Sequence, residues 1–338
     1  MDSDIVSELD LALVHALQIR PRAAWSDLAP LLGVTAVTLA RRWERLTREG
    51  LAWLAAVPGR TFSRTRCTAF VLLSCAPVDR ERLAARVAQL TEAVTVELTA
   101  PGGADLLLDV LAPTPAALHE FVTGRLARLP EVTGVECLFA TSLYADGTRW
   151  RLGSLDASQL MALDPAGNGD RDAGGAPAVD ALDRELLGAL AEDGRLGLAE
   201  LAQRTGTSAA TVRRRLHRLT GADVVAFRCD VAPALTGLPV AVTFRGRAPV
   251  RDVNALHRTL GTLPECRLVA AVTGSANILA TYWLRDIGAV QHRETTMCAR
   301  LPSLEITDRV LGERTVKRMG HLLDADGRRT GTCPIRPW

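Results

Sequence analysis

The feature that most constrains the fold of this chain is an internal repeat, because a repeat means that one structural unit is used more than once. The segment "LDLALVHALQIRPRAAWSDLAPLLGVTAVTLARRWERL", from Leu9, aligns without gaps with "LDRELLGALAEDGRLGLAELAQRTGTSAATVRRRLHRL", from Leu182. A weaker match follows, "TAPGGADLLLDV" over "AVTGSANILATY". The 338 residues, which is enough chain for two or three domains, are therefore one two-part module present twice.

The first part of each module has the spacing of a helix-turn-helix. Short amphipathic helices are separated by Gly33 in the first copy and by Gly206 in the second, where a tight turn favours glycine. Ser208 stands where it can cap the next helix. Because strands follow the helices, we expect a winged type of helix-turn-helix in both copies.

The helix after each turn is basic on the face opposite its apolar stripe. "TSAATVRRRLHRL" (207–219) holds four arginines and no acid, whereas Glu44 and Glu49 offset part of the charge in the first copy. The chain as a whole carries only +2, so a nucleic-acid role must rest on such local patches. A charged helix face is usually just solvated, but the recurrence in two copies favours DNA, since arginine binds phosphate oxygens and guanine edges. The candidate DNA-binding residues are Thr35, Thr38, Arg41, Arg42, Arg45, Ser208, Thr211, Arg213, Arg214, Arg215 and Arg218.

The second part of each module alternates between extended and helical patterns in the order βαββαβ. In the second copy we expect strands near 239–245, 266–273, 277–284 and 303–312, with helices at 250–262 and 286–300. An antiparallel sheet covered by helices on one face leaves the other face open. We therefore expect the two sheets to pair within one chain as a pseudo-dimer.

The expected organisation is α+β and duplicated. It comprises helix-turn-helix domains at 1–57 and 179–227, βαββαβ domains at 64–152 and 236–320, a flexible linker at 153–178 and a tail at 321–338. The linker expectation rests on "DPAGNGDRDAGGAPA", which is rich in Gly, Ala, Pro and Asp.

Helix-turn-helix, connecting strand and βαββαβ in this order resemble the Lrp/AsnC (feast/famine) family of transcriptional regulators, here in a tandem form. The resemblance implies a ferredoxin-like domain that mediates dimerisation and binds a small effector, typically an amino acid, near the hairpin between its second and third strands. A Gly-acid-x-acid pattern is common there, and this chain keeps the glycine but only one acid. The implied effector-binding residues are Gly102, Gly103, Asp105, Gly274, Ser275 and Asn277. Asp105 could equally be a turn residue that bonds its own backbone.

The same architecture also resembles sirohaem decarboxylases, which gives an enzymatic alternative. Those resemblances rest on His- and Tyr-rich stretches, and the corresponding segment here has no histidine and only Tyr282. Phosphate loops, zinc-protease motifs and serine-hydrolase motifs are absent, and the seven cysteines form no C-x-x-C. We therefore expect no enzyme, no cofactor and no metal. The expected partners are double-stranded DNA and a small effector, with a possible homo-oligomer, in the cytoplasm and away from membranes.

Overall fold

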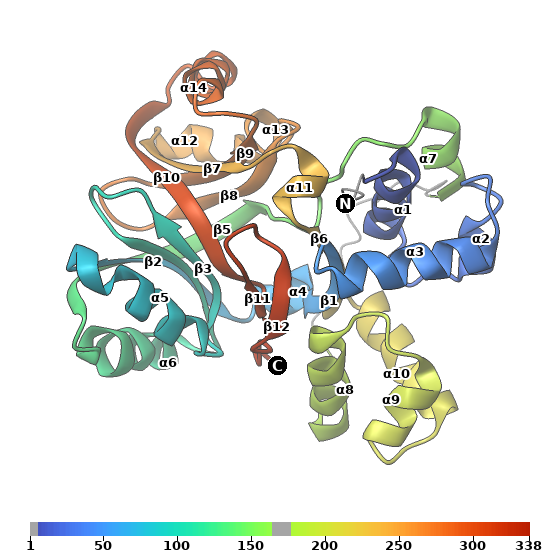
Figure 1. The fold of residues 1–338 in the computed structure, drawn as a ribbon. Helices are drawn as coiled ribbons and strands as arrows, with labels where there is room; N and C mark the ends of the chain where they lie inside the picture. Colours follow the sequence, from blue (N-terminus) through green and yellow to red (C-terminus); the bar gives the residue numbers. More distant parts are fainter. Residues whose placement is uncertain (1–5, 164–176) are drawn as a thin grey trace.

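The computed structural model describes residues 6–163 and 177–338, and it is divided into a pair of helical heads and a strand barrel. Figure 1 shows the heads together on one side and the barrel on the other. Head one contains α1 (Glu8–Ile19), α2 (Trp25–Leu28) and α3 (Ala36–Arg48). Head two contains α8 (Ala181–Glu192), α9 (Leu198–Arg204) and α10 (Ala209–Gly221). The α+β class and the two helix-turn-helix units expected from the sequence are confirmed.

Local sequence explains where these helices begin. The Thr35 and Ser208 side chains accept hydrogen bonds from the third residue of α3 and α10, which satisfies a backbone N–H at each helix start. Gly33 and Gly206 adopt φ values of +67° and +62°, a conformation that favours glycine and that lets the chain turn between helices. The apolar stripe of α10, made of Val212, Leu216 and Leu219, is buried as its spacing predicts.

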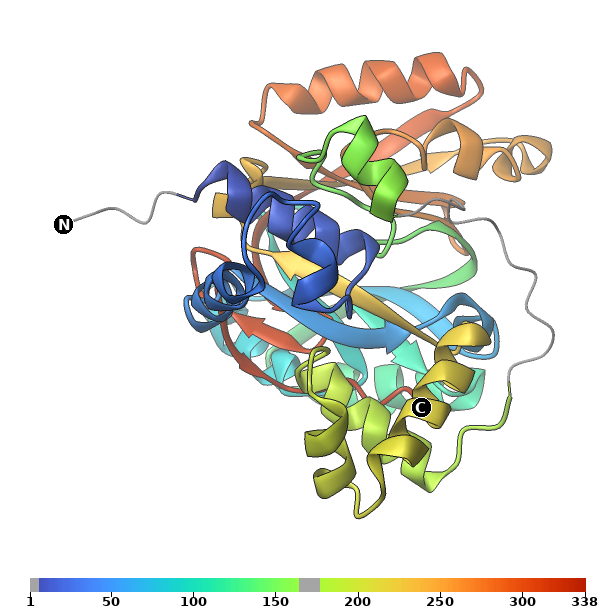
Figure 2. The same ribbon diagram turned by 90° about the vertical axis from the view of Figure 1, so that its right-hand side faces the viewer.

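Each head is completed by the other copy. The strands β1 (Ala52–Pro58) and β6 (Val225–Val231) follow the two heads and pair antiparallel with each other, so they form a ribbon between the heads and the barrel, visible in Figure 2. Cys229 and Val231 of β6 belong to the core of head one, while Ala56 of β1 belongs to the core of head two. Neither helix-turn-helix therefore has an independent core.

The barrel consists of two βαββαβ halves. The strands of the first half are β2 (Cys67–Cys75), β3 (Ala93–Thr99), β4 (Leu106–Ala112) and β5 (Val132–Ala145). Those of the second half are β7 (Val240–Arg247), β8 (Cys266–Val272), β9 (Ile278–Leu284) and β10 (Glu305–Arg318). Each half has the same internal strand order, 2-3-1-4 by position in the motif.

Helices cover the outer surface of each half. The first half carries α5 (Arg80–Ala88) after the short 3₁₀ turn η1 (Pro77–Asp79), and then α6 (Pro115–His119), a π-helical turn η2 (Glu120–Arg125) and η3 (Leu126–Arg128). The second half carries α12 (Val250–Val253), α13 (Leu256–Thr259) and α14 (Ala289–Arg300). The helix expected at 250–262 is therefore two short helices.

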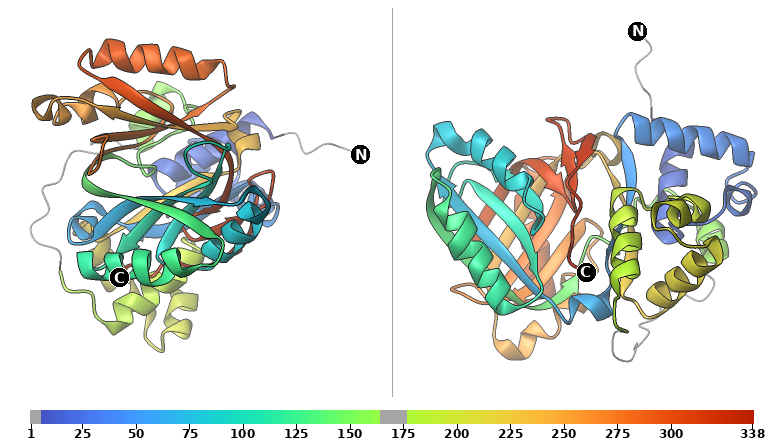
Figure 3. Two further views of the ribbon diagram at one scale, coloured as in Figure 1. Left: turned by 90° about the vertical axis from the view of Figure 1, so that its left-hand side faces the viewer. Right: turned by 90° about the horizontal axis from the view of Figure 1, so that it is seen from below.

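The two halves close into one barrel through their edges, which Figure 3 shows most clearly in its right-hand view. The last strand of each half is 14 residues long, so its first part pairs within its own sheet and its second part crosses to the other copy. β5 pairs with β8 and β10 pairs with β3, both antiparallel. The expectation that the sheets pair within one chain thus agrees with the strand register, but β10 extends six residues beyond the predicted end at 312.

Two segments differ from the sequence expectation. The first part of the expected flexible linker is ordered, because α7 (Ala157–Leu163) packs on head one, with Leu155 and Leu163 in its core; residues 164–176 lie outside the described residues. The expected tail forms β11 (His321–Leu323) and β12 (Arg329–Thr332), which extend the sheet from β10.

Short helices α4 (Arg60–Ser63) and α11 (Pro233–Thr236) follow β1 and β6. Among the described helices, none is long and apolar enough to cross a membrane.

Candidate functional site

The arginines proposed to face DNA fall into two groups in the structure. Arg41, Arg213 and Arg214 are exposed and form no ion pair with a described residue. Arg42, Arg45, Arg215 and Arg218 instead reach back to the first helix of their own head. The expectation that helix 208–219 lacks a compensating acid is therefore wrong in three dimensions, since the acid comes from another helix.

That acid is a buried aspartate at an equivalent position in each copy. Asp10 is fully buried and forms ion pairs with Arg42 at 3.0 Å and with Arg45 at 2.7 Å. Asp183 is fully buried and forms ion pairs with Arg215, at 2.9 Å, and with Arg218. Each aspartate also closes a capping box with the residue before its helix. These four arginines therefore neutralise a buried carboxylate, in addition to any contact with DNA.

The electrostatics of Asp10 agree with this structural role. Burial by itself raises the pKa of the Asp10 carboxyl, but hydrogen bonds from the backbone and hydroxyl of Ser7, with the guanidinium groups of Arg42 and Arg45, outweigh burial and hold the pKa below its usual range. The carboxylate is thus ionised and paired at neutral pH. The sequence held a sign of this pairing, because Asp10 aligns with Asp183 in the repeat and the paired arginines of the two copies align as well.

The N-terminal ends of α3 and α10, the second helices of the two helix-turn-helix units, are the parts of the heads best exposed for a partner. Thr35 and Ser208 are exposed, and Thr38 and Thr211 stand one turn further on, each bonded to its capping residue. Arg213 and Arg214 add two exposed cations on head two, whereas head one exposes Arg41 beside Glu44. The two heads therefore present unequal charge.

A reciprocal arginine pair fixes the two heads against each other. Arg22 donates to the backbone carbonyls of Gly194 and Leu196, and Arg195 donates to those of Pro21 and Ala23 at 2.7 and 3.0 Å. Burial lowers the pKa of the Arg195 guanidinium to about 10. Since each half-buried guanidinium donates to carbonyls of the other copy, this contact sets the relative position of the heads.

The two hairpin loops, where the resemblance implied an effector, use their polar side chains to hold strand ends. Asp105 accepts a hydrogen bond from the backbone N–H of Cys75 at 2.9 Å and lies 3.4 Å from Arg80. Asn277 bonds both the N–H and the C=O of Ala248. Asp105 therefore bonds the backbone of β2, 30 residues away in the chain, and not its own backbone as the turn alternative expected. Effector binding at these loops, including Gly102, Gly103, Gly274 and Ser275, stays a prediction.

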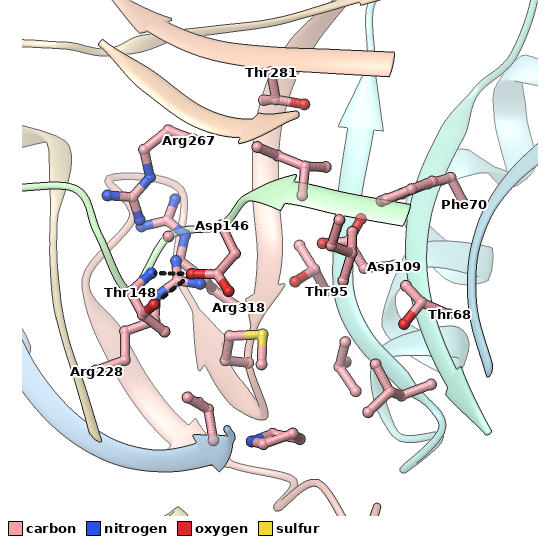
Figure 4. Close-up of a pocket in the computed structure, with 18 of the residues that line it drawn as sticks. Thr68, Phe70, Thr95, Asp109, Asp146, Thr148, Arg228, Arg267, Thr281 and Arg318 are labelled. Carbon is pink, nitrogen blue, oxygen red and sulfur yellow. Dashed lines mark hydrogen bonds between the residues drawn. The ribbon is translucent and has the colours of Figure 1, made fainter. Parts of the chain in front are cut away.

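A cavity of about 160 Å³ lies elsewhere, inside the barrel below the β1–β6 ribbon, and none of the six hairpin residues lines it. Figure 4 shows its polar groups divided between two ends. Arg228, Arg267 and Arg318 gather with Asp146 at one end, and Thr68, Thr95 and Asp109 stand at the other. Apolar side chains, among them Phe70, Leu107 and Leu268, also line the cavity.

The arginine end holds three guanidinium groups around one buried carboxylate. Asp230 lies 2.7 Å from Arg228 and 3.2 Å from Arg267, and these three side chains are 2, 12 and 7% exposed. Arg318, also buried, bonds only neutral oxygens, the Val231 carbonyl and the Thr315 hydroxyl, both at 3.2 Å. Among the described residues, Arg318 has no carboxylate within ion-pair distance.

Aromatic rings support this arginine end. Arg267 stacks on Trp283 and Trp150, with 3.8 and 4.7 Å from its Cζ atom to the ring centroids, and Arg318 lies over the same Trp283 at 4.4 Å. Such cation–π contacts hold a guanidinium without using its N–H donors. Burial lowers the pKa of Arg318 to about 10, so the group is still a cation at neutral pH.

The cavity is also lined by two acids whose ionisation is suppressed. Burial raises the pKa of Glu97 to about 7 and that of Asp109 to about 6, although the charges of Arg318 and Arg228 act in the other direction. Burial also raises the pKa of Asp230, but there the three adjacent arginines outweigh it and the net shift is downward. The cavity is thus cationic at one end and weakly acidic at the other.

Sequence reasoning missed this cavity, since five of its charged residues come from five different strands. Arg228 belongs to β6, Arg267 to β8, Arg318 to β10, Glu97 to β3 and Asp109 to β4. The only trace in the sequence is an ionisable residue within an otherwise apolar strand, as in "LLLDVLA". Among the described residues, no group of His, Cys, Asp and Glu could hold a metal ion, and the seven cysteines are free.

Comparison with known proteins agrees with the duplicated organisation. The model of the AsnC-type helix-turn-helix domain matches residues 6–47 and 179–220, and that of the Lrp/AsnC ligand-binding domain matches residues 68–150. Regulatory protein AsnC of Escherichia coli (strain K12) is 32% identical over 117 residues, which are 34% of this chain and 76% of AsnC. An uncharacterised HTH-type transcriptional regulator of Pyrococcus abyssi is 26% identical over 144 residues, 42% of this chain and 90% of that protein.

A solved structure matches the whole architecture. The siroheme decarboxylase NirDL aligns over 92% of this chain and 93% of its own, with a TM-score of 0.59 and 12% sequence identity. At that identity the likeness shows only that the fold is shared. With the helix-turn-helix matched twice and AsnC matched over three quarters of its length, the chain belongs to the Lrp/AsnC family.

Proposed function

We propose that this protein is a sequence-specific DNA-binding transcriptional regulator whose two heads read DNA and whose barrel responds to a small effector. The observation that carries the proposal is the pair of helix-turn-helix units, each with its second helix capped by an exposed Thr or Ser and followed by exposed arginine. An α-helix enters the major groove with its N-terminal residues towards the bases. The family and its regulator-named relatives support the same function.

The structure sharpens the choice of residues for this role. Arg213 and Arg214 are free to bind phosphate or bases, and Arg41 is their counterpart on head one. Arg42, Arg45, Arg215 and Arg218 support the heads through Asp10 and Asp183 and reach DNA only with the exposed parts of their side chains, 23 to 40% of each. Thr35, Thr38, Ser208 and Thr211 stay in the proposed interface.

The experiment is selection of bound fragments from the source genome, followed by fluorescence anisotropy on the selected DNA at varied salt. Replacing Arg213 and Arg214 with Ala should flatten the log–log salt dependence by about 0.9 for each phosphate that the variant no longer binds. The matched control replaces Arg251 and Arg258, two exposed arginines of the barrel helices, and should leave the slope unchanged. Equal slopes in both variants would reject this DNA interface.

The alternative function, decarboxylation of a sirohaem-like tetrapyrrole, is favoured by the shared architecture with NirDL. Two features count against this cavity as the tetrapyrrole site. The residues that line it include no histidine and no tyrosine, and about 160 Å³ is room for a molecule near the size of benzene rather than for four pyrrole rings. Visible absorption after addition of sirohaem would reveal tetrapyrrole binding, and its appearance with a fixed stoichiometry would favour the enzyme.

A further inference from the structure

The cavity inside the barrel has the features of a ligand site that the hairpin loops lack. We propose that it binds a small carboxylate whose far end carries a hydroxyl or amino group, and that the bound molecule acts on the heads through strand β6. The binding step stands on the cavity alone, whereas the action on the heads rests on the proposed regulatory function.

The arginine end has an unmatched positive charge. Arg228 and Arg267 share the buried carboxylate of Asp230, and Arg318 has no ion-pair partner among the described residues. A buried charge without a counter-ion is costly, so a bound anion would stabilise this arrangement. The planar fork of arginine suits a carboxylate, because two parallel N–H groups can bind its two oxygens.

Asp146 does not cancel this charge in the way that Asp230 does. Its Oδ1 atom accepts hydrogen bonds from both the backbone N–H and the hydroxyl of Thr148, so it holds the loop between β5 and the first head. Arg228 packs against the neighbouring Gly147, where a Cβ would approach its guanidinium to 2.5 Å. The loop therefore fixes Arg228 at the cavity wall.

The far end offers acceptors for a hydrogen-bond donor. Asp109 and Thr95 stand across the cavity from the arginines, in register on adjacent strands, and Glu97 lies two residues further along β3. A hydroxyl or ammonium group on the ligand would donate to these oxygens, while an unsubstituted hydrocarbon end would leave them unpaired, which is unfavourable in a buried site. The volume of about 160 Å³ limits the ligand to a few carbon atoms between the two ends.

Strand β6 connects the cavity to the heads because its side chains alternate between them. Arg228 lines the cavity and pairs with Asp230, while Phe227, Cys229 and Val231 pack on the core of head one. β6 also pairs along its whole length with β1, which contributes to the cores of both heads. A ligand that draws Arg228 inward thus acts on the strand to which the heads are attached. A ligand can shift the heads only by this kind of differential contact.

The test is calorimetry on the full-length chain with three matched series of three to six carbons: unsubstituted, ω-hydroxy and ω-amino carboxylates, with inorganic phosphate beside them. Tryptophan fluorescence gives a second readout, since Trp283 lines the cavity and stacks on two of the arginines. We expect binding of a hydroxy or amino compound, at least about 10-fold tighter than its unsubstituted analogue. The more tightly bound series identifies the group at the far end.

Two variants locate the bound molecule. Arg318→Met should weaken binding by about 10-fold or more, and the matched control Arg293→Met should not, because Arg293 is equally buried and stacks on Tyr282 but lies outside the cavity. Should Arg318→Met fail to fold, Asp109→Asn serves instead; it keeps the side-chain shape and should remove the preference for a hydroxyl or amino group. No binding in any carboxylate series, binding of phosphate alone, or binding unchanged in both Arg318→Met and Asp109→Asn would overturn the proposal.

DNA binding by the same preparations separates this inference from the proposed function. Wild-type protein that binds DNA without responding to a bound carboxylate would refute the action on the heads and leave DNA recognition intact. Protein that binds a carboxylate in the cavity but no genomic fragment would refute the proposed function and leave the ligand site intact.

Discussion

Replacing the buried Asp183 by Asn should destabilise head two selectively. Asn keeps the shape of the side chain and one acceptor oxygen, so the substitution removes mainly the negative charge. Arg218 would then keep only the Ala178 carbonyl at 3.2 Å, while Arg215 would keep the exposed Asp180 at 2.6 Å. The capping hydrogen bond from the Asp180 N–H, 3.2 Å long, would also weaken.

The magnitude follows from burial on both sides of the pair. Removing one partner of a fully buried ion pair costs about 3–5 kcal/mol. Here the aspartate is fully buried but the Arg215 and Arg218 side chains are 23 and 40% exposed, so water recovers part of the loss. We therefore expect head two to lose about 2 kcal/mol, which is a factor of about 30 in its opening equilibrium.

Native-state hydrogen exchange of the amides in α8, α9 and α10 measures this opening without assuming that the whole chain unfolds in one step. The matched control is Asp180→Asn, which makes the same charge change at a side chain that is 54% exposed and keeps a good N-cap. It should cost clearly less stability than Asp183→Asn, because water screens an exposed pair. If protection of head two in Asp183→Asn equals that in Asp180→Asn, the structural role assigned to the buried aspartate is wrong.

Three further predictions concern pH and the contact between the heads. The pKa of Asp10 is lowered in the folded state. Its contribution to stability is therefore present above its unfolded pKa of about 3.9 and is lost as pH falls through the folded value. Asp10→Asn should make amide hydrogen exchange of head one insensitive to acid over that range. The pKa of Glu97 is raised to about 7, so the wild type should lose stability as pH rises from about 4 to 7, and Glu97→Gln should be more stable at pH 8 by about 1–2 kcal/mol, with no difference near pH 4 in thermal unfolding. Replacing Arg22 and Arg195 with Met should lower DNA affinity at an unchanged salt slope, since the heads no longer hold a fixed spacing but still bind the same phosphates; a change in slope instead would assign these arginines to the DNA interface.

The expected elements were local ones, and local sequence explains why they were found. Gly33 and Gly206 mark turns by backbone conformation, and the caps at Thr35 and Ser208 satisfy neighbouring N–H groups. Apolar spacing placed the βαββαβ strands close to their observed bounds, with β9 at 278–284 against an expected 277–284. These features depend on residues within about one turn or one hairpin of each other, so the sequence alone contains them.

The misjudged features depend on residues far apart. Helix α10 itself contains no acidic residue to balance its arginines. Asp183, 35 residues before Arg218 in the chain, accepts a hydrogen bond from that arginine. The residues beyond 312 have no alternation that demands a strand, yet they continue β10 because the open edge of β3 supplies backbone partners. The early linker residues became ordered since Leu155 and Leu163 find an apolar surface on head one.

The sequence by itself determined the duplication, the helix-turn-helix units and the two βαββαβ halves, because periodicity, caps and turns act between neighbouring residues. Only the tertiary structure decided which arginines of the heads pair with a buried aspartate and where a cavity forms. Those outcomes depend on closing the barrel, which brings Arg228, Arg267 and Arg318 around one aspartate and sets Asp109 opposite them. Charge in a protein acts through distance and burial, and both are fixed only when separate strands meet.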